Sequence, residues 1–443
     1  MKKRALATWL AGLAGFVYLG NSGIVFAQFE ESSFKLSAFG TLGAVHTNTD
    51  KSEAQFTSST NLQHAGASNS GWEGTVDSKI GAQAVYRLNP NWSATLQVLS
   101  KKGPDNTFFP KTEWAYLKYE PTRNLAFKVG RIRLPTFMLS DSLDVGYSQH
   151  WVRPPVEVYA QLPFGTADGI DMVYRMNLGD TVLTLQPLYG NLSAKVVTPP
   201  VQEGKDKDVL GLNATLEVGN LTLRAGAFKG RLTFPSDGDG ENPIAAAVDG
   251  LSTGFAPFLT PAQRTAYSEL ANQLRARSVN SYFSGVGAIY DNGSLLVQSE
   301  YTVRNGGTDA VKSSNAWYLT TGYHLGKWMP YATYADLRVT TPTSYTDPLN
   351  TIISNTPVPL VGSPGVSDLV TALRQSGYSN QHTFSLGVRY DVIKNIALKA
   401  QFDHITTSGP SGATRGLFIN TSPGFNAGSN SVNVFSIAAD FVF

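Results

Sequence analysis

The stretch TVDSKIGAQAVYRLNPNWSATLQVLSK, residues 75–101, predicts two β-strands joined by a tight turn. Apolar and polar side chains alternate along both arms with the two-residue period of a strand. The arms meet at Asn89-Pro90-Asn91, residue types that favour a turn. The hairpin therefore has one polar, charged face and one apolar face, which consists of Val76, Ile80, Ala82, Ala84, Tyr86, Leu88, Trp92, Ala94, Leu96 and Val98.

The same unit recurs along the chain. Tight turns are expected at 89–91, 121–124, 179–180, 219–220, 291–293, 326–327 and 391–395. They alternate with longer connections at 49–74, 102–110, 132–168, 191–208, 231–278, 305–313, 340–379 and 407–430. Seven turns and eight long connections join sixteen strands.

This alternation favours an all-β, antiparallel, up-and-down transmembrane barrel. Such a barrel keeps its short turns on one side of the membrane and its long loops on the other. Strands of about ten residues fit a tilted crossing of the hydrocarbon layer, and only a closed barrel leaves no unpaired backbone there. A soluble antiparallel sheet could show the same two faces. However, aromatic residues gather beside the short turns, as expected of an interfacial girdle: Tyr86, Trp92, Trp328, Tyr390 and Phe441.

The polar faces carry charge far from the strand ends, which suits a watery lumen better than a packed core. The charged residues expected to point inward are Lys79, Arg175, Arg224, Arg389, Lys399 and Asp403. One strand breaks the pattern, since the alternation of Leu125, Phe127 and Val129 would turn Arg131 toward lipid. We therefore expect the strand to end or bulge at Gly130.

The chain begins with Lys2-Lys3-Arg4, an apolar run and Val25-Phe26-Ala27. This order predicts a secretory signal peptide over residues 1–27, with the barrel over 28–443; the alternative is an uncleaved anchor helix. The sequence contains no cysteine, which excludes disulfides and thiolate sites. Without its three leading cations the chain has 32 basic against 33 acidic side chains, so no nucleic-acid partner is indicated.

With this leader, sixteen strands and a final strand SVNVFSIAADFVF (431–443), the chain resembles the trimeric, sixteen-stranded porins of Gram-negative outer membranes. The resemblance implies an outer-membrane location, a homotrimer, and contact with outer-membrane lipid and lipopolysaccharide. It also implies that the barrel assembly machinery recognises the terminal Phe443. Val129-Gly130-Arg131 is similar to the Gly-Arg that precedes the inward-folded third loop of some porins, whereas the Pro-Glu-Phe-Gly-Gly stretch of enteric porins is absent.

If the long third loop folds into the lumen, its acidic residues can face basic residues of the wall. The acidic candidates are Asp141, Asp144 and Glu157; the basic candidates are Lys79, Lys128, Arg131, Arg133 and Arg175. Opposed charges at a narrowing orient polar solutes and set selectivity. Each residue has a simpler alternative as a solvated wall residue or loop ion pair. Tyr147, Trp151 and Tyr159 could alternatively form a stacking platform for sugars or aromatic acids.

We therefore expect a non-enzymatic pore, without metal or cofactor, for passive diffusion of ions and small polar solutes. A substrate-selective channel for anionic or aromatic small molecules is the alternative. An outer-membrane lipid hydrolase would need a lipid-facing Ser and His with Asn or Asp; His404, beside Asp403, shares an apolar face and is expected to be interfacial. In the fifth loop, TPAQRTAYSELANQLRARS (260–278) predicts a helix capped by Thr260 with Pro261 first.

Overall fold

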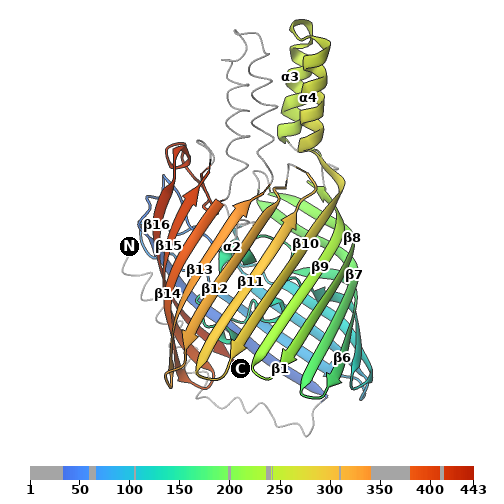
Figure 1. Cartoon of the computed structure of the whole chain (residues 1–443), viewed down its shortest axis with the longest axis vertical. Helices are drawn as coiled ribbons and strands as arrows, with labels where there is room; N and C mark the ends of the chain where they lie inside the picture. The colour runs from blue at the N-terminus through green and yellow to red at the C-terminus, as the bar shows by residue number, and fades with distance from the viewer. Residues whose placement is uncertain are drawn as a thin grey trace. The chain divides into compact units, whose positions relative to one another are not determined.

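The computed structural model describes residues 33–58, 66–103, 106–197, 201–235, 241, 243–308, 311–340, 380–409 and 414–443. Sixteen antiparallel strands form one closed barrel in which each strand pairs with its neighbours in sequence and β1 pairs with β16 (Figure 1). The first eight are β1 Phe34–Thr47, β2 Lys79–Arg87, β3 Trp92–Lys101, β4 Lys111–Thr122, β5 Leu125–Arg133, β6 Thr166–Leu178, β7 Thr181–Val197 and β8 Val201–Val218. The others are β9 Leu221–Phe234, β10 Ala276–Asp291, β11 Leu295–Asn305, β12 Ser314–Tyr323, β13 Trp328–Val339, β14 Asn380–Ile393, β15 Ile396–Ser408 and β16 Asn430–Val442.

This architecture confirms the expected up-and-down barrel and its strand number. Closure leaves no edge strand. Four of the short turns contain a glycine with positive φ, a backbone conformation that side chains disfavour: Gly179, Gly219, Gly293 and Gly326. The turn chemistry visible in the sequence therefore placed the strand boundaries on that side of the barrel.

Helical segments occur only in the long connections of the described chain. The third connection contains η1 Ser140–Ser142, η2 Gly146–Ser148 and α2 Val156–Tyr159. The fifth contains α3 Pro243–Gly254, η3 Ala256–Phe258 and α4 Pro261–Leu274, and the last contains η4 Phe425–Ala427. As expected, α4 starts at Pro261; Thr260 and Gln263 form a reciprocal capping box. None of the described helices combines the length and the apolar composition that a membrane-spanning helix requires.

The outer surface of the barrel is apolar. Large side chains exposed there include Ile80, Leu96, Val129, Leu212, Val286, Leu319, Leu386 and Ile437. Next to the short turns, Trp92 stacks on Tyr119 with ring centroids 4.6 Å apart, and Trp328 lies 4.3 Å from Tyr390. This is the expected arrangement of a lipid-facing band bordered by aromatic residues.

Two expectations about individual residues are wrong. Val76 was expected on the apolar outer face, but β2 begins at Lys79, and Val76 is buried in a cluster with Val45 and Phe56 under the long loops. The strand was also expected to end or bulge at Gly130. Instead β5 keeps its register with both neighbours through this residue, whose φ is +129°.

Arg131 is accommodated by charge pairing rather than by a bulge. Its Nε and Nη2 atoms donate to the two carboxylate oxygens of Asp168 on β6, each at 2.8 Å. Bidentate pairing of this kind is the strongest form of arginine–carboxylate contact. The register of β5 and β6 places Arg131 opposite Asp168, so the charge of Arg131 is compensated without a break in the pairing of the two strands.

Candidate functional site

The connection between β5 and β6, residues 134–165, lies inside the barrel and is called the inner loop below. Its Met138 N–H donates to Glu300 Oε1 on β11 at 2.9 Å, and Trp151 Nε1–H to Thr333 Oγ1 on β13 at 3.0 Å. α2 contacts β11, β12 and β13 and lies within the ring of strands (Figure 1). The inner loop therefore crosses the lumen from β5 to the opposite wall.

Apolar packing holds the inner loop against β10–β13. Phe137, Trp151 and Val158 share a buried cluster with Phe283 on β10 and Tyr318 on β12. Because burying a large aromatic side chain contributes roughly 2–3 kcal/mol, this contact is a major part of the docking energy.

The structure does not support the alternative in which Tyr147, Trp151 and Tyr159 form a stacking platform. Trp151 is only 1% exposed, so no solute can reach its faces. Tyr159 donates to Glu300 Oε2 at 2.9 Å, whereas Tyr147 donates to the carbonyl of Lys394. These three aromatic side chains therefore anchor the loop at separate places on the wall.

Glu157 is also a docking residue and does not face a channel. It is 1% exposed and accepts hydrogen bonds from Gln381 Nε2 at 2.6 Å and from Thr383 Oγ1, both on β14. Burial raises the pKa of Glu157, although these two hydrogen bonds act in the opposite direction. Asp141, the loop's other outlying acid, is exposed on η1. Neither acid joins the cluster around Asp144.

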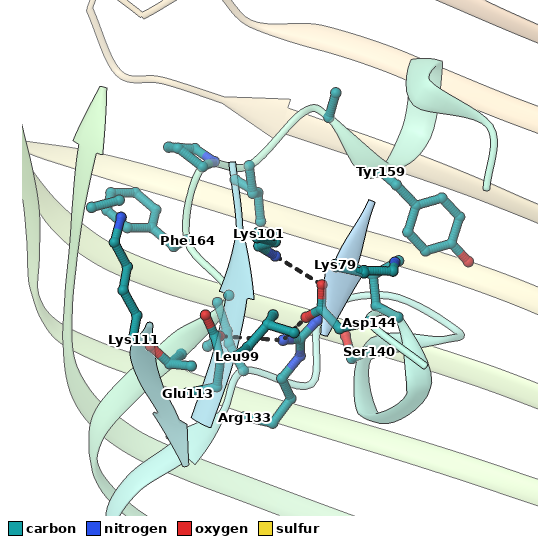
Figure 2. A pocket seen from close by; sticks show the side chains of 18 of the residues that line it. Lys79, Leu99, Lys101, Lys111, Glu113, Arg133, Ser140, Asp144, Tyr159 and Phe164 are labelled. Carbon is teal, nitrogen blue, oxygen red and sulfur yellow. Dashed lines mark hydrogen bonds and ion pairs between the residues drawn. The ribbon is translucent and has the colours of Figure 1, made fainter. Parts of the chain in front are cut away.

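A cavity of about 660 Å³ lies between the inner loop and the wall around β2–β7 (Figure 2). Asp144 lies at its centre and accepts from Lys101 Nζ at 2.8 Å and from Arg133 Nη1 at 3.1 Å. Arg133 is also 3.8 Å from Glu113 Oε2. Burial opposes ionisation of Asp144, but Lys101, Arg133 and Lys79 together hold its pKa well below the ordinary value.

Of the candidate residues, Lys79, Arg133 and Asp144 come together at this cavity, and Arg131 also reaches it, paired with Asp168. Lys128 and Arg175 are not among the residues that line it. Lys128 forms an ion pair with Asp171 at 3.2 Å. Arg175 is exposed close to the short turn, where its backbone N–H donates to the carbonyl of Asn124.

Sequence reasoning did not select Lys101, Lys111 and Glu113. Lys101 shares the polar parity of the opening hairpin, so a signal for it was present. For Glu113 the signal was misleading, because the register of β3 and β4 shifts between Gln97 and Val98 and reverses the alternation above that point.

The cavity lining is predominantly basic. Eight basic and five acidic side chains are among its described residues. Both Asp144 and Glu113 lie against Arg133, and Asp144 also pairs with Lys101. Lys79, Lys111 and Lys195 line the cavity with no carboxylate at ion-pair distance in the part of the chain that the structure describes.

His404 lies on the outer face of β15, away from this cavity. Its Nδ1 is 2.8 Å from Asn433 Oδ1 on β16. Within the described chain no serine hydroxyl is hydrogen-bonded to His404, so the nucleophile that a hydrolase triad requires is not in place.

A closed sixteen-stranded barrel with an apolar exterior, a polar lumen and an inward-folded loop defines a membrane pore. The family model for Gram-negative porins matches residues 8–348, and the chain belongs to this family. The protein is thus an outer-membrane pore for diffusion of small solutes. None of the curated proteins compared with the chain matches it.

Several solved structures are similar to this chain at low sequence identity. The Salmonella typhi OmpF complex with daunomycin has a TM-score of 0.51 and 10% identity, covering 93% of this chain and 97% of that chain. The outer membrane channel DcaP of Acinetobacter baumannii has a TM-score of 0.49 and 11% sequence identity, and the match covers 93% of this chain and 97% of that chain. The anion-selective porin from Comamonas acidovorans has a TM-score of 0.46 and 11% sequence identity, and the match covers 93% of this chain and 100% of that chain.

Proposed function

We propose that the pore conducts small hydrophilic solutes passively and favours anions. The observation that carries this proposal is the excess of basic side chains on the cavity; among the described residues, no carboxylate lies at ion-pair distance from Lys79, Lys111 or Lys195. A narrow, low-dielectric passage lined by one sign of charge concentrates the opposite ion. Asp144 and Glu113 offset only part of this positive charge, because both carboxylates lie beside Arg133 and neither is at ion-pair distance from the three lysines.

The test is the reversal potential of the purified protein in a planar bilayer under a KCl gradient. We expect preference for Cl⁻, and in Lys79→Gln/Lys111→Gln a shift toward equal permeability of about twofold or more. Lys229→Gln is the matched control, since Lys229 lies over the Tyr282 ring on the outer face of the barrel. Cation preference in the wild type, or no shift in the double variant, would contradict the proposal.

We infer that the protein assembles as a homotrimer. The outward faces of β2, β3 and β4 carry small side chains at Ala82, Ala84, Ala94 and Ala115, which permit a second barrel to approach closely. Light scattering of the detergent-solubilised protein measures the assembly directly. Ala84→Trp/Ala94→Trp should yield monomers of unchanged fold; a monomeric wild type would refute the inference.

We further propose that residues 1–27 are removed on export, that lipopolysaccharide contacts the outer rim, and that the barrel assembly machinery binds the last strand. Phe443 supports the last point. It is 62% exposed, while its backbone is hydrogen-bonded to Ala38. We also propose that the protein is no enzyme; phospholipase activity lost in His404→Ala would overturn this.

A further inference from the structure

The turn of the inner loop at residues 146–153 docks where the first and last strands close the barrel. Lys399 of β15 donates from Nζ to the carbonyls of Gly146 at 2.8 Å and Trp151 at 2.9 Å. The same ammonium group pairs with Asp440 of β16 at 2.6 Å, and Asp440 accepts from Thr41 of β1 at 2.5 Å. The loop is therefore bonded to β15 and lies against the pair β16 and β1, called the closing seam below.

Arg153 adds a second attachment at this seam. Its Nε and Nη2 atoms donate to Asp77, just before β2, at 3.0 and 2.6 Å, and Nη1 donates to Asp403 of β15 at 3.1 Å. Nη2 also donates to Ser436 of β16 at 2.6 Å. The side chain is only 6% exposed, so these charges attract each other with little screening by water.

The planar guanidinium group suits this position better than any other side chain. It satisfies one carboxylate in a bidentate manner while a third nitrogen reaches another, a geometry that an ammonium group cannot reproduce. The guanidinium group also lies over the Phe56 ring, with Arg153 Cζ 5.0 Å from the ring centroid. One side chain thus joins the inner loop to the first long loop and to two strands.

Gly146 shows how closely the turn fits. A Cβ atom at this residue would lie 2.2 Å from Asp440 Oδ1 and 2.4 Å from Thr41 Oγ1. Both atoms belong to side chains already fixed by their hydrogen bond to each other. The loop can therefore approach the seam this closely only with glycine at the contact.

Docking at the seam determines where the open cavity lies. The loop is drawn toward β15, β16 and β1, and the cavity remains beside β2–β7. Asp144, two residues before Gly146, projects from the same loop into that cavity. Movement of the turn would change both the width of the cavity and the place of its central carboxylate.

We propose that Arg153 is a positioning residue that holds the inner loop on the closing seam and so sets the aperture of the pore. The proposal rests on the proposed function only in that the protein conducts solutes. It does not depend on the sign of the ion preference.

The experiment compares Arg153→Ala with the wild type in planar bilayers. We expect unit conductance to rise by about twofold and the channel to admit larger polyethylene glycols, because the released loop no longer narrows the lumen. Polymer exclusion reports aperture and is insensitive to the lost charge. Arg231→Ala is the matched control, since Arg231 is paired with Asp208 on the outer face.

Loss of Arg153 leaves two buried carboxylates unpaired, which can prevent folding. Asp77→Asn/Arg153→Met/Asp403→Asn removes all three charges together and keeps the side-chain volumes, so it provides a folded comparison. The same increase in conductance and polymer cutoff is expected. Wild-type values in this folded triple variant would overturn the role of Arg153, whereas absence of channels in the wild type would instead refute the proposed function.

Discussion

Asp144 and Glu157 belong to the same loop but have opposite surroundings. Asp144 meets Lys101 and Arg133, and these cations keep its pKa low despite burial. Glu157 accepts hydrogen bonds from the neutral Gln381 and Thr383, and burial raises its pKa. The chemistry of a carboxyl group in the lumen is thus decided by its partners.

Glu157→Gln should stabilise the barrel more at pH 8 than at pH 5. A carboxyl group with a raised folded pKa binds its proton more tightly in the folded state, so its contribution to stability falls as pH rises through that pKa. A glutamine side chain does not ionise, so this loss of stability at high pH disappears. Its amide oxygen can still accept the hydrogen bond from Gln381. Urea unfolding of both proteins at the two pH values measures the difference; equal gains at both would contradict it.

Asp144→Asn should increase the preference for anions. The substitution removes the negative charge at the centre of the cavity and frees Lys101 and Arg133. We expect the Cl⁻ to K⁺ permeability ratio to rise by about twofold or more. The control is Asp208→Asn on the outer face, which should leave the reversal potential unchanged.

At the scale of elements, the strands were predictable because their information is local. Period-two alternation and turn residues located all sixteen strands. The helix α4 was also predictable, since its cap lies within four residues of sequence. The prediction failed at Val76, because the start of β2 depends on its pairing with neighbouring strands. Glu113 was not selected as a site residue, because the register shift between β3 and β4 cannot be seen in one strand alone.

The site was less predictable for the same reason. The contacts of Arg153 join residues 76, 250 and 283 positions apart in sequence. No periodicity encodes such a separation. The alternation of side chains along the strand could show that Asp403 points inward. Only the fold shows that its carboxylate contacts Arg153 of the inner loop.

The α3–α4 hairpin should be dispensable for conduction. Its buried residues, such as Val248, Tyr267 and Leu270, pack mainly on each other and form a cluster separate from that of the lumen. Replacing residues 243–274 with a short Gly-Ser linker should leave a folded barrel with wild-type unit conductance. Altered conductance would show that the hairpin acts on the pore.

At the scale of the whole molecule, closure of the barrel and narrowing of the pore share residues. Thr41 and Asp440 are directly paired in the β1–β16 register, and their side chains form the surface on which Gly146 rests. The inner loop can therefore dock fully only after the first and last strands have met. A barrel that fails to close should also lack a defined constriction.

Variants of Phe443 can distinguish the closure of the barrel from its recognition by the assembly machinery. The Phe443 N–H donates to the carbonyl of Ala38 at 2.7 Å, and Ala38 N–H donates to the Phe443 carbonyl at 2.8 Å. Phe443→Ala keeps both backbone bonds, whereas deletion of Phe443 removes them at a cost of about 1 kcal/mol each. We expect Phe443→Ala to refold in detergent like the wild type but to reach the outer membrane poorly in cells. Deletion should impair both processes. Refolding yield and the amount of heat-modifiable protein in outer-membrane fractions measure the two effects, and normal cellular assembly of Phe443→Ala would show that the aromatic ring is not the recognised feature.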